Sequence, residues 1–242
     1  MTKQYNNSYT KSRTRTEYDL KCNEDFFCNL NTENSAYWAG FILADGNINK
    51  YCTRICLSIK DLSHLEKFKK VIESEHAISI TTTKKQNKEF MFCNLSICRK
   101  KMSEDLIYHG IGKDKSEICF LPPSLNERYI RHFIRGLFDG DGSFYLTSSK
   151  DSNVMSAHFK ISSPVIFILY QIQALLMKKC NLNRTKLDTF SENCASLVYN
   201  GNDEVRRIMN YLYDNSTIYL ERKYNLFVNH YKEIDTWRNR EI

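Results

Sequence analysis

Two aspartates, Asp45 and Asp141, occupy the same short pattern of residues, 96 positions apart. The first copy of the pattern is WAGFILADG at residues 38–46, and the second is IRGLFDGDG at residues 134–142. Carboxylates are hard oxygen ligands of the kind that Mg²⁺ prefers. Mg²⁺ held by few protein groups keeps bound water and accepts phosphate oxygens, as hydrolysis of a phosphodiester requires. The paired aspartates therefore predict a divalent-metal site that acts on phosphodiesters.

The small residues of the pattern indicate how two such segments would meet. Gly40 lies four residues before Ala44, and Gly136 lies four residues before Gly140, so each pair shares one face of a helix. A helical glycine costs about 1 kcal/mol relative to alanine, and close packing of the two helix backbones would offset that cost. Two helices packed in this way would end together.

The expected helix ends are an unfavourable place for two carboxylates. The helix dipole is negative at a C-terminus, and the two acids would also repel each other. A divalent cation between them resolves this conflict. Gly46 and Gly142 are expected to supply the flexible turn out of each helix. The alternative is two ordinary helix ends with Asp-Gly turns, which suits one copy of the motif better than two matched copies.

Each motif is followed by a matching series of elements. The order helix-strand-strand-helix-strand-strand-helix recurs at an offset near 100 residues. Strands are expected at residues 54–60, 77–83 and 89–98, and again at 157–162, 184–190 and 194–199, while helices are expected to begin at Asp61, Ser103, Ser163 and Asn202. This recurrence predicts an α+β fold made by tandem duplication, with antiparallel hairpins.

The boundaries of the halves follow from the repeat. We expect a basic polar arm at residues 1–30 and a first half-domain at 31–112. A linker at 113–125, which contains two adjacent prolines, leads to a second half-domain with a C-terminal tail at 126–242.

Composition narrows the possible partners and compartments. The net charge of +7 is compatible with a polyanionic partner but does not establish one. The nine cysteines include no C-x-x-C pair, which excludes zinc-ribbon spacings and favours reduced thiols. Residues 1–20 lack an apolar core, and the longest apolar run, 165–170, is too short to span a membrane. We therefore expect a protein of the cytoplasm or an organelle matrix that is not secreted.

At the two motifs the chain resembles the LAGLIDADG homing endonucleases, in the single-chain form with two motifs. The resemblance covers residues 31–224. It implies two αββαββα halves related by a pseudo-twofold axis, with the motif helices at their interface and a β-saddle over the major groove of DNA. It also implies that Asp45 and Asp141 bind catalytic Mg²⁺, as two or three divalent ions at the helix pair, assisted by the carbonyls of Ala44 and Gly140.

The sequence departs from this family near the metal ligands. The family has a second acid two positions before the metal-binding one, which Asp139 keeps and Leu43 does not. We expect Asp139 to be a non-catalytic surface or capping residue. The family also places a basic residue near the end of the second strand, a place that Lys60 fits in the first half and Lys160, two residues before Ser162, approximates in the second. Contact with a phosphate, or a solvated strand edge, accounts for either lysine equally well.

Polar and basic side chains along the expected strands suit readout of base edges in the major groove. Alternation along a strand places about half of them on the DNA side. Lys11, Arg13 and Arg15 in the arm are expected either to bind flanking phosphates or to belong to a disordered terminus. The candidate DNA-binding residues are Asn47, Asn49, Arg54, Thr81, Thr83, Lys85, Lys88, Thr147, Ser149, Lys150, His158, Arg184, Lys186 and Asn193.

These observations predict a monomeric endonuclease that cuts both strands of a long double-stranded DNA target, pseudo-palindromic or asymmetric in sequence, without a membrane partner. Two alternatives stay open. One is an intron maturase that binds RNA to assist splicing, and the other is a DNA-binding regulator that has lost cleavage. Retention of both aspartates argues against the regulator and mildly against the maturase.

Overall fold

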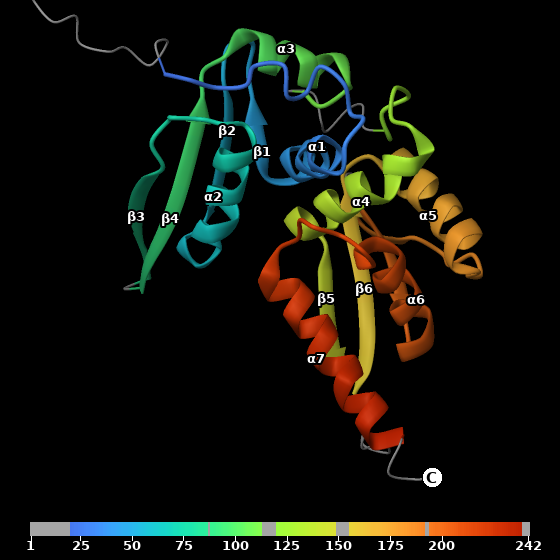
Figure 1. Ribbon diagram of the computed structural model, residues 1–242. Helices are drawn as coiled ribbons and strands as arrows, with labels where there is room; N and C mark the ends of the chain where they lie inside the picture. The colour runs from blue at the N-terminus through green and yellow to red at the C-terminus, as the bar shows by residue number, and fades with distance from the viewer. Residues whose placement is uncertain (1–19, 87, 113–119, 149–154, 192–193, 239–242) are drawn as a thin grey trace, which may run out of the picture.

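The computed structural model describes residues 20–86, 88–112, 120–148, 155–191 and 194–238. The chain forms two halves, one above the other in Figure 1, with α1 and α4 between them. The first half consists of α1 (Glu33–Asp45), β1 (Gly46–Ile48), β2 (Thr53–Ser58), α2 (Leu62–Val71), β3 (Ser79–Lys85), β4 (Lys88–Ile97) and α3 (Lys100–Tyr108). The second consists of α4 (Glu127–Asp141), β5 (Ser143–Thr147), β6 (Ser156–Ser163), α5 (Ile166–Cys180), β7 (Asp188–Ser191), β8 (Cys194–Asn200) and α6 (Asn202–Tyr213), followed by α7 (Glu221–Arg238). The α+β fold of tandem duplicated αββαββα halves is confirmed.

Each half holds a four-stranded antiparallel sheet with the same strand order. The orders are β1-β2-β4-β3 and β5-β6-β8-β7. Buried and exposed residues alternate along β2, and buried and half-buried residues alternate along β6. That period of two is expected where one face of a sheet packs on a core and the other meets solvent. The inner face of the first sheet packs on α2, and that of the second packs on α5 and α6.

Several element boundaries differ from those expected. Strand β2 stops at Ser58, and residues 59–61 form a 3-10 turn. The Asp61 carboxylate does not cap α2, because it accepts hydrogen bonds from Arg222 Nε at 3.0 and 3.1 Å. Helix α3 begins at Lys100 rather than at Ser103, whose buried hydroxyl lies 3.2 Å from Thr53 Oγ1. In each case a contact with a distant segment overrides the local capping signal.

The start and the end of the described chain are more ordered than the sequence indicated. Within the expected arm, Phe27 and Leu30 are buried in the core of the first half. Beyond Ser216, the expected tail contains α7, which runs beside β5 in Figure 1. Within the described part of the chain, every helix is too short or too polar to span a lipid bilayer.

Candidate active site

The motif helices α1 and α4 touch backbone to backbone through their glycines. A Cβ atom built on Gly40 would lie 2.0 Å from the Phe133 carbonyl oxygen, and one built on Gly136 would lie 1.9 Å from the Tyr37 carbonyl oxygen. No side chain fits at either point, so glycine is required there for steric reasons. The two contacts are reciprocal, as a pseudo-twofold axis between the helices requires. The predicted close packing of the motif helices is therefore present.

The two aspartates are the last residues of these helices. A Cβ built on Gly140 would lie 2.3 Å from Ala44 Cβ and 3.5 Å from Asp45 Oδ2. The Asp45 carboxylate therefore lies beside the last turn of α4, the turn that ends in Asp141. Both aspartates are exposed, and neither helix has a basic residue in its last turn. The paired helix dipoles make this place negative.

This donor set fits a Mg²⁺ ion. Among the described residues, no three His, Cys, Asp or Glu side chains cluster closely enough to hold a metal ion. A metal at the helix ends would therefore rely on two carboxylates, backbone carbonyls, water and phosphate. Mg²⁺ commonly binds with few protein ligands and retains water, whereas structural zinc sites are closed by four protein ligands.

Gly46 and Gly142 act differently from the flexible turns expected. Their φ angles are −83° and −75°, which any residue can adopt. A Cβ on Gly46 would instead lie 2.6 Å from the Ile42 carbonyl oxygen, and one on Gly142 would lie 2.7 Å from that of Phe138. Each glycine is needed because the chain folds back tightly against its own helix.

Lys223, in the first turn of α7, reaches the end of α4. Its Nζ donates hydrogen bonds to the carbonyl oxygens of Phe138 at 2.7 Å and Gly140 at 3.3 Å, and also to that of Gly142. Together with Asp141, Lys223 lines a cavity of about 510 Å³. Burial lowers the pKa of Lys223 to about 8, against the attraction of Asp139, Asp45 and Asp141. A buried lysine therefore lies within the electrostatic reach of both aspartates.

Asp139 is buried between the halves, not on the surface or at a helix cap as we expected. Its carboxylate accepts hydrogen bonds from Tyr37 of α1 at 2.8 Å, from the Leu220 backbone N–H at 2.8 Å, and from Tyr213 of α6. Burial raises the pKa of Asp139, and it raises the pKa values of both tyrosines further above their usual range. This acid ties α4 to the first half and to residues 217–223, which we call the closing segment.

The closing segment also crosses to the first half. Just beyond Leu220, Glu221 pairs with Lys67 of α2, and Arg222 pairs with Asp61. The chain leaving the second half is thus held against the first half immediately before Lys223. This arrangement determines the position of the lysine at the end of α4.

Comparison with known proteins adds to this geometry. Residues 128–212 match the family model of the LAGLIDADG-like domain. This match lies within the second half. No sequence among the curated proteins matches the chain.

Solved LAGLIDADG structures match both halves of the chain. The homing endonuclease I-WcaI bound to its DNA recognition sequence has a TM-score of 0.56 and 15% identity, over 83% of this chain and 90% of that chain. I-GzeII in complex with its DNA target has a TM-score of 0.55 and 14% identity, over 85% and 91%. I-SmaMI bound to uncleaved DNA in the presence of calcium ions has a TM-score of 0.53 and 16% identity, over 85% and 92%. The chain as a whole therefore has the single-chain LAGLIDADG fold, and the resemblance seen in its sequence is confirmed.

The basic residues expected near the LAGLIDADG aspartates take different places. Lys60 is exposed in the 3-10 turn after β2 rather than on the strand. Lys160 is half-buried on β6 and lies opposite Ser143, two residues after Asp141. In the first half, Asn47 is the residue two positions after Asp45, and it lies opposite Arg54. The counterpart of Lys160 by strand register is therefore Arg54, not Lys60.

The outer face of the first LAGLIDADG sheet gathers most of its candidate DNA-binding residues. Asn47 lies opposite Arg54, and Arg54 lies opposite Ser96, so these three share one face. The register from β2 through β4 to β3 places Thr81, Thr83, Lys85 and Lys88 on that face as well. Asn49 lies in the β1–β2 turn, where its Oδ1 accepts from the backbone N–H groups of Tyr51 and Cys52.

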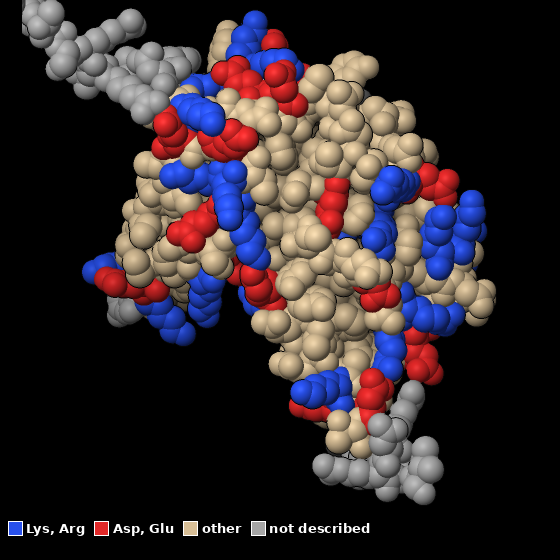
Figure 2. All heavy atoms as spheres, in the orientation of Figure 1, with Lys and Arg blue, Asp and Glu red and all other residues tan. Residues whose placement is uncertain are grey.

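The second sheet provides a compact polar group on its outer face. His158 stacks on Tyr145 with ring centroids 4.6 Å apart, and its ring nitrogens contact Thr147 Oγ1 at 2.7 Å and Asn200 Oδ1 at 2.6 Å. Arg184 and Lys186 precede β7 and are exposed outside the strand where they were expected. The candidates Ser149, Lys150, Asn193, Lys11, Arg13 and Arg15 lie outside the described residues. Figure 2 shows acidic and basic groups interspersed over the side that α2 and α7 cover.

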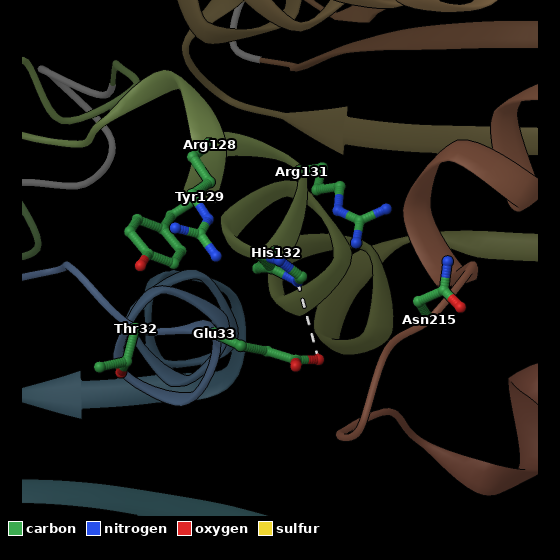
Figure 3. A pocket seen from close by; sticks show the side chains of 7 residues that line it. All are labelled: Thr32, Glu33, Arg128, Tyr129, Arg131, His132 and Asn215. Atoms are coloured by element: carbon green, nitrogen blue, oxygen red, sulfur yellow. Dashed lines mark ion pairs between the residues drawn. The ribbon is translucent and has the colours of Figure 1, made fainter.

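The opposite ends of the motif helices carry a second polar cluster. Glu33 accepts from Arg135 Nη2 at 2.7 Å and from the Thr217 backbone N–H at 2.8 Å. Burial opposes ionisation of Glu33, but the Thr217 N–H and the Arg135 guanidinium outweigh it and lower the pKa. Figure 3 shows Glu33 turned toward His132 at the edge of a cavity of about 560 Å³. Among the described residues, none of the predicted site residues lines this cavity. The contacts of Glu33 hold the two halves and the closing segment together.

Sequence reasoning missed Lys223 and the role of Asp139. The spacing of Tyr224, Phe227 and Tyr231 is typical of an apolar helix face and would have indicated α7. No local pattern indicates where that helix docks, because Lys223 contacts carbonyls more than 80 residues earlier in the chain.

Proposed function

We propose that this chain is a site-specific, metal-dependent endonuclease that cuts double-stranded DNA. The observation that carries the proposal is the position of Asp45 and Asp141 at the matched ends of two helices in backbone contact. Two sheets flank those ends, and their outer faces carry many polar side chains. The DNA complexes of I-WcaI and I-GzeII, which share the fold, support duplex DNA as the substrate. One chain carries both aspartates, which supports action as a monomer.

Asp45 and Asp141 are assigned to Mg²⁺ binding, with the carbonyls of Ala44 and Gly140 as further oxygen donors. The Gly140 carbonyl already accepts from Lys223, but a carbonyl oxygen has a second lone pair for a cation. When bound, Mg²⁺ would supply an activated water and charge stabilisation at the phosphate. The calcium-containing complex of I-SmaMI supports a divalent ion in this family.

Basic residues complete the proposed site. Lys223 holds the end of α4 in place through three carbonyl oxygens, so it positions Asp141 rather than contacting DNA. Arg54 and Lys160 lie at equivalent register positions on the outer faces, where a phosphate of each DNA strand would lie. Exposed Lys60 remains a candidate for phosphate contact.

Selection of a target followed by cleavage tests this proposal. The protein is first incubated with a random duplex library in Ca²⁺, so that bound DNA can be recovered without relying on cleavage. The recovered sequence is then cloned in a plasmid and treated with the protein in Mg²⁺. We expect linear plasmid, cut at one site on both strands. The variants Asp45→Asn and Asp141→Asn should each lower the rate by about 100- to 1,000-fold, while binding in a gel shift is retained.

Two results would overturn the proposal. One is full double-strand cleavage by either aspartate variant, which would show that these carboxylates do not hold the metal. The other is an absence of duplex selection together with tight binding of structured RNA, which would favour the maturase alternative.

A further inference from the structure

The thiols of Cys52 and Cys98 lie against each other at one end of the first sheet. Their Sγ atoms are 2.8 Å apart, and both residues are half-buried. Cys52 immediately precedes β2, and Cys98 immediately follows β4. Because Thr53 pairs directly with Ile97, the two cysteines are the next opposite pair along these antiparallel strands.

This register suits a disulfide bond. Opposite residues of antiparallel strands have Cα atoms about 4.5–5.5 Å apart, within the range of about 4.4–6.8 Å that disulfides span. The sulfur atoms are already in contact. Bond formation therefore requires a small approach of two side chains and no rearrangement of the sheet.

The surrounding contacts hold both cysteines in position. On one side, Asn49 Oδ1 accepts from the Cys52 backbone N–H at 2.8 Å, and the Asn49 N–H donates to the Cys52 carbonyl at 2.9 Å. On the other side, Arg99, which is buried, donates to the Cys98 carbonyl at 3.0 Å. The pair is thus fixed by a closed turn and by the start of α3. Neither residue is fully buried.

We propose that Cys52 and Cys98 form a reversible modification site that takes oxidants of the peroxide class. One thiolate attacks a peroxide oxygen, the O–O bond breaks, hydroxide leaves and that cysteine becomes a sulfenic acid. The second thiol then attacks the oxidised sulfur, forming the S–S bond as the S–O bond breaks. With hydrogen peroxide, two thiols yield one disulfide and two water molecules. A thiol reductant reverses the modification by thiol–disulfide exchange.

The bond would close a loop from residue 52 to residue 98 and join the β1–β2 turn to the start of α3. Restriction of the unfolded chain should raise the melting temperature by about 5–10 °C. The turn lies at the end of β1 away from Asp45, so the bond does not involve the proposed metal ligands. A peptide map detects the modification without any measurement of cleavage.

Peptide mapping of the folded, full-length protein tests this inference. Fully reduced protein is treated with hydrogen peroxide, quenched with N-ethylmaleimide and digested without reductant. Mass spectrometry should find a peptide pair linked through Cys52 and Cys98, which dithiothreitol separates. The linked peptide and the rise in melting temperature should be lost in Cys52→Ser and in Cys98→Ser. Both should persist in Cys28→Ser, which removes an exposed thiol elsewhere.

Peptide mapping of the wild-type protein tests the inference by itself, so the test does not depend on whether a cysteine variant folds. Recovery of Cys52 and Cys98 both alkylated, after peroxide has oxidised other cysteines, would overturn the inference. A link from either residue to a different cysteine would overturn it as well. A linked pair without a rise in melting temperature would contradict the proposed restriction of the loop.

Discussion

The ends of α1 and α4 carry the same Asp-Gly pair, but the chain supports them differently. At the end of α4, Lys223 donates to three carbonyl oxygens and Asp139 is buried among polar partners. In the first half, the position that matches Asp139 is Leu43, buried in the apolar core, and Lys60 lies exposed on the surface. The two halves have the aspartates at matching positions, but the contacts that hold them differ.

This difference separates two ways of fixing a helix end. Apolar packing around Leu43 tolerates small changes in volume at a moderate cost. A buried polar network is more demanding, because each group that loses its partner bears the full cost of desolvation. The second half should therefore be the more sensitive of the two to conservative substitutions.

Asp139→Leu, which places the first-half residue in the second half, should have the largest effect. It leaves the hydroxyls of Tyr37 and Tyr213 and the Leu220 N–H without their acceptor. We expect a loss of about 3–5 kcal/mol in the free energy of unfolding, measured by urea denaturation. Asp188→Ala, at an exposed carboxylate on β7, is the matched control and should change it by less than about 0.5 kcal/mol. If both variants unfolded at the same urea concentration, the hydrogen bonds of Asp139 would not stabilise the second half.

Gly40→Ala and Gly136→Ala test what the two halves share. The added methyl groups would clash with backbone carbonyls of the facing helix, so each variant should lose at least about 3 kcal/mol. Thermal unfolding should show similar losses for both, because the contacts are reciprocal. Gly112→Ala is the control, since a Cβ there meets Ile107 at an ordinary 3.5 Å. A large difference between the first two variants would contradict the pseudo-symmetry of the helix pair.

Lys223→Met and Lys60→Met compare the basic residues of the two halves. Removing the ammonium group of Lys223 releases the last turn of α4, so cleavage should fall by about 10- to 100-fold with DNA affinity little changed. Lys60→Met should act mainly on DNA affinity, because the contact that we propose for this exposed side chain is with a phosphate. Single-turnover cleavage and gel-shift titration separate the two effects. The reverse pattern would reassign the basic residue of the site to the first half.

His64 should make the first half sensitive to acid. Tyr37 donates its hydroxyl hydrogen to Asp139, so His64 Nε2 donates to Tyr37. The buried His64 Nδ1 has no hydrogen-bond partner among the described residues. Burial lowers the pKa of His64 to about 3. The ordinary pKa of a histidine is near 6.5. Between pH 6.5 and pH 3, His64 therefore binds a proton in the unfolded chain but not in the folded chain.

Stability that depends on neutral His64 is therefore complete above about pH 6.5 and is lost as the pH falls toward 3. Relative to His64→Gln, the wild type should lose about 1.4 kcal/mol for each pH unit below 6.5. Urea denaturation of both proteins between pH 7 and pH 4.5 measures this difference. Parallel curves would show that the histidine is not the group responsible.

The sequence was informative where chemistry and repetition coincide. Asp45 and Asp141 end their helices as predicted, and Gly40 and Gly136 make the expected contact. These features could be predicted because close packing of two helices permits only glycine at the contact, and the glycine then stands at a fixed spacing from the aspartate. The order of strands and helices could also be predicted from the sequence, because alternating burial and helical spacing are local properties.

Long-range contacts were not accessible in the same way. Asp139 looked like a surface acid because its partners, Tyr37 and Tyr213, are 102 and 74 residues away in the chain. The sequence placed Ser162 at the position matching Lys60, with Lys160 as an approximate counterpart. The register instead places Lys160 opposite Ser143 and Arg54 opposite Asn47. Such pairings depend on which segments meet, which a single sequence does not reveal.

The closing segment has a consequence for the order in which the molecule is made. Residues 217–223 follow both halves in the chain, yet they hold Asp139 and the end of α4. A growing polypeptide can form both sheets and both aspartate-bearing helices while this segment is still inside the ribosome. The centre between the halves is completed only after residues beyond Lys223 have been synthesised. A nascent chain would thus carry both aspartates before the contacts that complete the centre between the halves could form.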